Sequence, residues 1–349
     1  MVRSIFLIGI LACALEAQAG MSVVELVSWD TARGGETPLR LYSHVISGET
    51  AYINMTGSGI TPLVRVDGLN GTQARTTIVS GIEWFLVAGD TRLTATKGMG
   101  LSHGYLQFGD VRSDAIWRVN PDTGGVIAYV DQASISNFTG RSKVYILDFQ
   151  AVNPASGEHV FYEGESDGIY ITTGSNAVAL VADSTALSNA FGSTEVSGGM
   201  TYDAAGNLYW GNAEVDLVGM RTTGGVLQTA LSQAQIEGVL GLGPTNLSFG
   251  AVFYAPDGWV YFFERGTRNI MRFDPSDPPG TLAIHVTTAE LLAGPAAEDD
   301  AAGSFGWYHG FLTFNYVNKP AGIYMAVPEP GVWGLLGVGC AAVSRRERS

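Results

Sequence analysis

The sequence predicts an all-β fold: a six-bladed β-propeller with four-stranded blades, in which an N-terminal strand completes the last blade. Three observations predict it. A pattern of short apolar runs and Gly-rich turns occurs six times. Equivalent positions of the copies (65, 118, 171, 221, 272 and 325) are 53, 53, 50, 51 and 53 residues apart, a period typical of propeller blades. Residues 20 to 327 number 308, close to six such periods.

Each copy contains runs with the length and the apolar or alternating pattern of β-strands. The turns between them are rich in strand breakers, as in "NPDTGG" and "DPSDPPG". One further run precedes each copy and supplies an innermost strand, which gives four strands per blade. These preceding runs are "PLRLYSH", "GMGLSH", "KVYILDF", "GGMTYDA", "GAVFYAP" and "SFGWYH".

The sixth copy ends after "GIYMAV" and lacks its outermost run. The segment Ser22–Asp30, "SVVELVSWD", resembles the outermost run of the second copy and can fill this place. A strand from the start of the chain that pairs with strands from its end leaves no free sheet edge between the first and last blades. Two other architectures stay open at this point: a seven-bladed ring with one degenerate blade, and a large β-sandwich.

Two further expectations concern the contacts between blades. Short polar stretches such as "DQASISNFTG" and "TTAELLAG" follow most outermost runs, and we expect one-turn helical connections there, with Ser or Thr as N-caps. An arginine recurs in the third strand of four copies, and we expect ion pairs from blade to blade. These arginines are Arg65, Arg118, Arg221 and Arg272.

The composition fits a large core without covalent cross-links. Hydrophobic residues make up 46% of the chain and charged residues 15%, the balance of a folded domain. The two cysteines, Cys13 and Cys340, lie in the terminal apolar runs, so the region between them has no disulfide and no cysteine zinc site. A net charge of −14 argues against a nucleic-acid partner, and against binding to an anionic membrane by charge.

The first 19 residues have the features of a secretory signal peptide. Arg3 gives a positive start, residues 5–15 are apolar, and Ala17 and Ala19 form a small-x-small cleavage site. The apolar run is shorter than the roughly 20 residues that span a bilayer. We therefore expect residues 1–19 to be removed, so that the mature chain starts at Gly20.

The tail, residues 328–349, combines a Pro-Glu-Pro motif, a short apolar segment and a cluster of arginines, in this order. The motif is Pro328, Glu329 and Pro330, and the arginines are Arg345, Arg346 and Arg348. The tail resembles the PEP-CTERM sorting signal of Gram-negative, biofilm-forming bacteria. Its apolar segment, residues 331–343, is 13 residues long and therefore short for a membrane span.

This resemblance implies how the protein is processed and where it goes. It implies cleavage near the motif by a membrane enzyme of the exosortase type and transient membrane association through the tail. It also implies delivery to the cell surface or the extracellular biofilm matrix. The chain is thereby divided into a signal peptide (1–19), a propeller (20–327) and a sorting segment (328–349).

The middle region resembles six-bladed propellers of the NHL and gluconolactonase type in blade number and strand–turn pattern. It carries no nucleophile-elbow, zinc-protease, P-loop or dinucleotide-binding motif, and we assign no catalytic residue. An enzymatic function would therefore rest on fold analogy alone.

Two groups of residues are candidate metal ligands, although we assign no cofactor. His44, His103 and His309 are expected in the turns after innermost strands of neighbouring blades, where they could hold a transition metal or serve only as turn residues. The turns between second and third strands are acidic, and could bind calcium, act on a sugar as acid–base pairs, or form a solvated face. The acidic residues are Asp110, Asp114, Glu163, Glu165, Asp167, Glu214, Asp216 and Glu264.

Two functions are compatible with these features. The first is an exported surface or matrix protein without catalytic activity, which has a structural role or binds polysaccharide or another protein. The alternative is a secreted metal-dependent hydrolase or lactonase. The missing motifs favour the first. Five tryptophans could stack on sugar rings or belong to the core: Trp84, Trp117, Trp210, Trp259 and Trp307.

Overall fold

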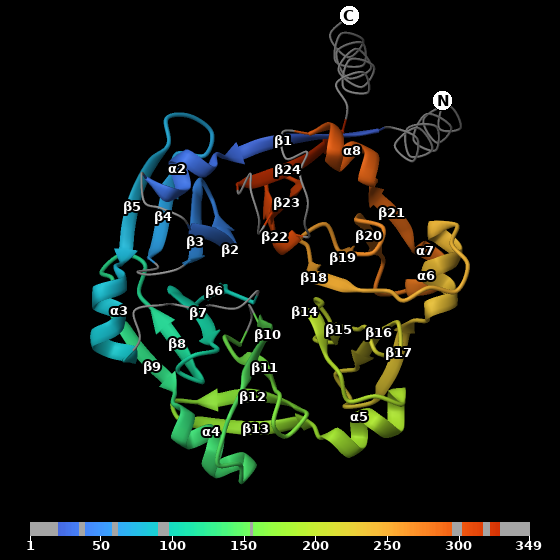
Figure 1. Cartoon of the computed structure of the whole chain (residues 1–349), viewed down its shortest axis with the longest axis horizontal. Coiled ribbons are helices and arrows are strands. Elements are labelled where there is room, and N and C mark those ends of the chain that lie inside the picture. The colour runs from blue at the N-terminus through green and yellow to red at the C-terminus, as the bar shows by residue number, and fades with distance from the viewer. Residues whose placement is uncertain are drawn as a thin grey trace, which may run out of the picture.

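The computed structural model describes residues 20–34, 39–57, 62–89, 98–153, 156–294, 302–316 and 322–328. They form six four-stranded antiparallel sheets arranged in a ring around a central axis (Figure 1). The predicted six-bladed propeller is confirmed, and the seven-bladed ring and the sandwich are wrong.

Blades 1 to 3 each follow the chain from the axis outward. Blade 1 consists of β2 (Leu39–Ser47), β3 (Thr50–Gly57), β4 (Leu63–Asp67) and β5 (Ala74–Val79). Blade 2 consists of β6 (Gly100–Ser102), β7 (Tyr105–Asp110), β8 (Ala115–Val119) and β9 (Val126–Val130). Blade 3 consists of β10 (Ile146–Val152), β11 (His159–Glu163), β12 (Gly168–Gly174) and β13 (Ala177–Ala182).

Blades 4 and 5 repeat this order, and blade 6 borrows its outermost strand. Blade 4 consists of β14 (Ser197–Tyr202), β15 (Leu208–Asn212), β16 (Leu217–Arg221) and β17 (Leu227–Leu231). Blade 5 consists of β18 (Phe249–Tyr254), β19 (Val260–Glu264), β20 (Asn269–Phe273) and β21 (Ala283–Val286). Blade 6 consists of β22 (Ala302–Tyr308), β23 (Phe311–Tyr316), β24 (Ile323–Pro328) and β1 (Met21–Val27).

Strand β1 closes the ring in the predicted way. It pairs antiparallel with β24, so that Met21 lies opposite Pro328 and Val27 opposite Ile323. The backbone N–H of Met21 also donates to Glu290 Oε1 at 2.5 Å, which ties the start of the strand to blade 5. The first and last parts of the described chain thus share one sheet, and Pro328 of the Pro-Glu-Pro motif is still part of it.

The core lies between the blades. Six buried hydrophobic clusters are present, and each contains residues of two neighbouring blades. Large aromatic side chains fill them, and Trp84, Trp210 and Phe262 are almost completely buried. Because burial of one such side chain contributes about 1.5–3 kcal/mol, this packing can hold the ring together without a disulfide.

A helix follows the outermost strand of every blade. These helices are α2 (Trp29–Arg33), α3 (Gly81–Ala88), α4 (Gln132–Thr139), α5 (Ser184–Phe191), α6 (Gln233–Leu240) and α8 (Thr288–Ala293). A further short helix, α7 (Pro278–Thr281), lies in the turn between β20 and β21. Four of the six connecting helices have eight residues, which is about two turns. The expectation of one-turn connections is therefore wrong for these four. The N-caps are Ser28, Ser80, Asp131, Asp183, Ser232 and Thr287.

Every connecting helix is fixed by a pair of buried apolar side chains, which lie at equivalent positions in all six. The residue before the N-cap, which ends the outermost strand, and the residue four positions after the cap are both buried in one cluster, as in a hydrophobic staple. The pairs are Val27–Ala32, Val79–Trp84, Val130–Ile135, Ala182–Leu187, Leu231–Ile236 and Val286–Leu291.

The meander of each blade gives the ring two different faces. The turns that join first to second and third to fourth strands lie on one side, called here the turn face. The turns between second and third strands share the opposite side, the helix face, with the connections between blades. In the described residues we find no helix with the length and apolar character needed to cross a bilayer.

Candidate functional site

His44, a predicted metal ligand, lies within strand β2 and not in the turn where we expected it. Its ring is buried against blade 6, with Nδ1 2.9 Å from Ser304 Oγ and Nε2 3.0 Å from Thr313 Oγ1. Because the Ser304 hydroxyl donates to Asn315 Oδ1, Nδ1 of His44 donates and Nε2 accepts. Burial lowers the pKa of His44 to about 4. Both ring nitrogens are therefore engaged in a neutral hydrogen-bond network.

His103 and His309 do occupy tight turns after innermost strands, with φ of 49° and 48°. Nε2 of His309 lies 2.7 Å from Glu49 Oε1, and the ring of His103 lies against Gly157. The structure therefore does not bring the three predicted histidines together. In the described parts of the chain, no three His, Cys, Asp or Glu side chains gather closely enough to hold a metal ion.

Two of the acidic residues predicted on the helix face have a structural role. Glu163 and Glu264 end the second strands of blades 3 and 5 and are fully buried. Each carboxylate accepts hydrogen bonds from backbone N–H groups of its own turn. It also accepts one from the residue directly before the first strand of its blade. The donors are Tyr145, Glu165 and Ser166 for Glu163, and Ser248, Gly266 and Thr267 for Glu264.

The equivalent residues of blades 2 and 4 cap their turns in the same way. Asp110 accepts from the Ser113 N–H, and Asn212 from the N–H groups of Glu214 and Val215. At the end of the same turn of blade 4, Asp216 accepts from the N–H of Leu247, which lies just before the first strand of blade 5, at 2.6 Å. The polar residues at these positions thus serve the backbone of the ring.

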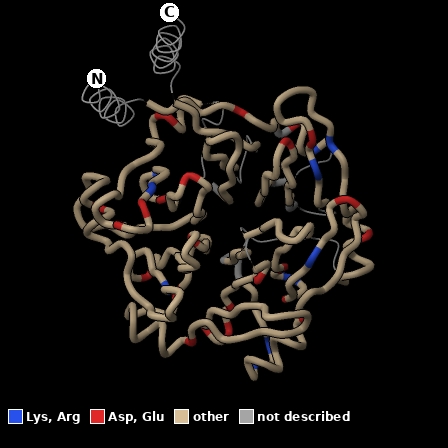
Figure 2. The backbone as a smooth tube through the Cα atoms, turned by 180° about the vertical axis from the view of Figure 1, so that it is seen from behind, with Lys and Arg blue, Asp and Glu red and all other residues tan. Residues whose placement is uncertain are grey.

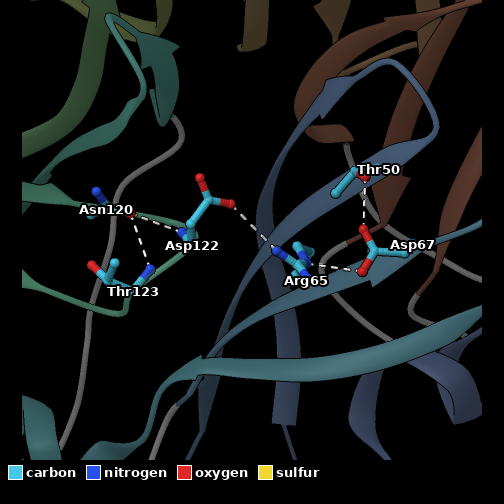
Figure 3. Close-up of polar contacts among 6 residues, drawn as sticks. All are labelled: Thr50, Arg65, Asp67, Asn120, Asp122 and Thr123. Atoms are coloured by element: carbon cyan, nitrogen blue, oxygen red, sulfur yellow. Dashed lines mark hydrogen bonds and ion pairs between the residues drawn. The ribbon is translucent and has the colours of Figure 1, made fainter.

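Arg65 forms the one predicted blade-to-blade ion pair that the described residues show. Its Nη1 lies 3.7 Å from Asp122 Oδ1 in blade 2, and its Nε lies 2.9 Å from Asp67 Oδ2 in its own blade (Figure 3). Asn120 Oδ1 accepts from the N–H groups of Asp122 and Thr123 and so holds the turn that carries Asp122. Exposed pairs of this kind contribute about 0–1 kcal/mol.

Three of the five tryptophans belong to the core, and two do not. Trp84, Trp117 and Trp210 are 1%, 4% and 0% exposed. Trp259 and Trp307 are half-buried and pack against the same hydrophobic cluster between blades 5 and 6. The structure thus selects two of the predicted residues as candidates for contact with a ligand.

Trp259 and Trp307 belong to an aromatic group that we call the blade 5–6 platform: Trp259, Tyr261, Arg272, His285 and Trp307. The Tyr261 ring centroid lies 6.2 Å from that of Trp307 and 4.9 Å from that of His285. The Arg272 guanidinium lies over Trp259, 4.5 Å from the ring centroid. One platform thus combines aromatic faces with a cation and an imidazole.

The local sequence explains how the platform is held. Trp259 directly follows the turn before β19, in which Asp257 accepts from the Trp259 N–H at 3.1 Å and from the Tyr261 hydroxyl at 2.6 Å. Burial, with a further contribution from the Arg272 charge, lowers the pKa of His285 to about 3. His285 is therefore neutral at ordinary pH and offers one donor and one acceptor.

A polar group at the turn face joins blade 6 to blade 1, on the side of blade 6 that faces away from the platform. Trp307 leads directly into Tyr308 and His309, and both hydrogen-bond to Glu49 of blade 1, at 2.6 and 2.7 Å. The Tyr308 hydrogen bond is the main cause that lowers the pKa of Glu49. Sequence reasoning had marked Trp259, Trp307 and His309, but not Arg272 or His285 as their neighbours.

Comparison with known proteins gives the fold and no family. No protein-family description and no curated sequence matches the chain. Among solved structures it is similar to a virginiamycin B lyase variant from Staphylococcus aureus, with 13% identity and a TM-score of 0.52, over 88% of this chain and all of the other. It is also similar to the calcium-binding protein regucalcin from Agrobacterium tumefaciens (10%, 0.52, 83% and 90% covered). A third similar structure is an auxiliary nutrient binding protein from Bacteroides thetaiotaomicron (9%, 0.55, 89% and 77%).

These similar proteins include a lyase, a calcium-binding protein and a nutrient-binding protein. At identities of 9–13% they show a common architecture only. The likeness to propellers that we saw in the strand–turn pattern is therefore confirmed at the level of the fold: the chain is a six-bladed β-propeller.

Proposed function

We propose that the chain is an exported propeller of the cell surface or extracellular matrix, which binds polysaccharide on the blade 5–6 platform without catalysis. The observation that carries the proposal is that two half-buried tryptophans, Trp259 and Trp307, pack against one cluster between blades 5 and 6 near the turn face. Trp84, Trp117 and Trp210 are buried in the core, so Trp259 and Trp307 are the predicted tryptophans that a ligand can reach.

The chemistry of the platform fits a sugar. The C–H faces of a pyranose ring pack on aromatic faces, and the two half-buried tryptophans offer such faces, each with one polar edge. Arg272 and the neutral His285 lie beside these faces and can donate to, or accept from, hydroxyl groups. The net charge of −14 makes a neutral polysaccharide a better ligand than a polyanion.

The proposed location rests on the sequence. Residues 1–19 and 329–349, with Ala17, Ala19 and the cluster Arg345, Arg346 and Arg348, lie outside the described residues. The signal-peptide pattern and the PEP-CTERM resemblance support export from a Gram-negative cell, with an exosortase-type enzyme as processing partner. Mass spectrometry of the secreted protein, with Pro328, Glu329 and Pro330 replaced together, tests this part of the proposal.

Binding to neutral polysaccharides tests the role of the platform. We expect affinity electrophoresis of the native protein to show retardation that Trp259→Ala or Trp307→Ala reduces several-fold, since stacking on an aromatic ring is worth about 0.5–1.5 kcal/mol. Phe138→Ala is the control, because Phe138 is also an exposed aromatic residue, 49% exposed, on the distant helix α4. Equal loss in the control, or unchanged binding in both tryptophan variants, would contradict the proposal.

The alternative, a metal-dependent hydrolase or lactonase, gives a different result in elemental analysis. A stoichiometric metal that is lost in His103→Ala, together with hydrolysis of sugar lactones, would favour that function. Polysaccharide binding without turnover favours the proposal.

A further inference from the structure

Helix α3 presents an apolar surface on the outer rim between blades 1 and 2. Ile82, Phe85, Leu86 and Val87 are 62%, 49%, 77% and 48% exposed. Ile82, Phe85 and Leu86 follow the i, i+3, i+4 spacing of a single helix face. Ile127 on the nearby strand β9 is 50% exposed. We call these five residues the α3 patch.

The equivalent helices show that the connection itself does not need this surface. Five and six residues after the N-cap, α3 has Phe85 and Leu86. At the same two positions α2 has Arg33 and Gly34, α4 has Ser136 and Asn137, α5 has Ser188 and Asn189, and α6 has Glu237 and Gly238, whereas α8 is also apolar there, with Leu292 (45% exposed) and Ala293. A contiguous exposed apolar patch marks an interaction site, whereas single exposed residues do not.

The patch is held rigidly. Trp84, the buried member of the staple, is 1% exposed and packs against Trp117 with ring centroids 4.9 Å apart. Ser80 and Glu83 form a capping box at the start of the helix. The outward side chains are therefore presented in a fixed arrangement, which favours binding because little ordering is needed.

Charge argues against a membrane as the occupant. Helices that lie on membranes carry Lys or Arg beside their apolar face, and α3 has neither. Its one charged residue, Glu83, is acidic, and the net charge of −14 disfavours approach to an anionic lipid surface. The neighbouring exposed residues of β5 and β9, Thr76, Thr77 and Ala128, are uncharged. Apart from Glu83, such a surface adds no charge to the repulsion between two acidic molecules.

We propose that the occupant is the α3 patch of a second copy, with the two helices packed antiparallel about a twofold axis. Such an interface uses one patch twice and needs no other partner. Exposed apolar patches of monomers measure on the order of 300–600 Å², whereas a stable interface takes about 800 Å² from each partner. The contact is therefore weak and reversible in solution, and gains strength where many copies are held close together.

Disulfide cross-linking of the full chain tests the contact, because the described region has no cysteine. With Cys13 and Cys340 replaced by serine, Leu86→Cys is compared with Asn189→Cys, which has the same place in α5. We expect oxidation to give several-fold more dimer with Leu86→Cys, at twice the monomer mass of 36.9 kDa. Equal dimer yields in the two variants would overturn the proposal.

Sedimentation and vesicle binding separate the other occupants. We expect the sedimentation coefficient of the parent chain to rise with concentration, and Leu86→Glu to abolish this rise while leaving the far-UV spectrum and melting temperature unchanged. A Leu86-dependent association with phosphatidylcholine vesicles, with no self-association, would assign the patch to a membrane and contradict the second copy.

Discussion

At the scale of single residues, the carboxylates that end second strands show how charge can be buried at little expense. Glu264 is fully buried, yet its two oxygens accept three backbone N–H groups and the Thr267 hydroxyl. Hydrogen bonds to an ionised group contribute about 1.5–3 kcal/mol each. They replace the water that the carboxylate loses, so the residue needs no metal ion to balance it.

We expect Glu264→Ala to lower the free energy of unfolding by about 2–4 kcal/mol, because several buried N–H groups lose their acceptor. Glu165→Ala is the matched control, since Glu165 is an exposed acidic residue of an equivalent turn, and should change stability by less than about 0.5 kcal/mol. Urea denaturation measures both. If calcium were instead the reason for the carboxylate, a chelator would destabilise the parent and leave Glu264→Ala unaffected.

The roles of single side chains were also harder to predict from the sequence than the strands were. The sequence showed acidic residues in the turns. It could not distinguish a carboxylate that faces solvent from one that accepts the hydrogen bonds of its own turn. His44 was assigned to a turn because it lies at the same repeat position as His103. In the structure, β2 has a bulge between Leu41 and Ser43 and stays paired with β3 as far as Ser47. Trp259 and Trp307 could be named, but their convergence with Arg272 depends on how blades 5 and 6 face each other.

At the scale of elements, the unit that repeats is a strand, a staple and a helix. The N-cap ends the strand, and the residue four positions later locks the helix onto the blade. In four of the six copies a glycine with positive φ lies nine residues after the cap and ends the helix, as at Gly140 and Gly192. This spacing makes these connections about two turns long.

The cap should make a measurable contribution. Asp183 accepts from the Ala186 N–H at 2.7 Å, and we expect Asp183→Ala to lower the free energy of unfolding by about 1 kcal/mol. Ser184→Ala, one position into the same helix, serves as control and should be nearly neutral. The midpoint of urea unfolding reports both. A loss in the control as large as that in Asp183→Ala would show that the cap is not the cause.

The strands could be predicted because their turns and apolar runs are local signals. The helices α2 and α3 were not predicted, although four others were. "GIEWFLVA" reads as a continuous apolar run, and its helical character depends on the Ser80 cap and on a blade surface for Trp84. The two features that make α3 hard to recognise, its apolar residues and its missing polar face, also make it distinctive on the folded ring.

At the scale of the whole molecule, the ring is closed by backbone pairing between the first and last described strands, as between Met21 and Pro328. In the part of the chain that the structure describes, acidic residues are scattered around the ring and are not gathered in one blade (Figure 2). Closure depends on β1, whose Val23, Leu26 and Val27 enter the clusters on both sides of blade 6.

We expect a chain that starts at Ser28, and therefore lacks β1, to lose cooperative unfolding and to aggregate, because the edge of β24 becomes free. A chain that starts at Met21 is the control and should behave like the parent. Thermal unfolding followed by circular dichroism, with and without a synthetic peptide of residues 21–27, measures the effect. An unchanged melting temperature after removal of β1 would contradict the closure by this strand.

The pairing of Met21 with Pro328 also determines where the ring could be attached to a surface through its tail. The two ends of the described chain therefore lie side by side on the perimeter of the ring, in strands β1 and β24 (Figure 1). An attachment at this point of the perimeter would leave the ring free to rotate about it. Neither the turn face nor the helix face would be covered by the surface that holds the protein. The proposed sugar-binding platform on the turn face and the α3 patch on the outer rim would then both stay accessible, so that each could bind a different partner.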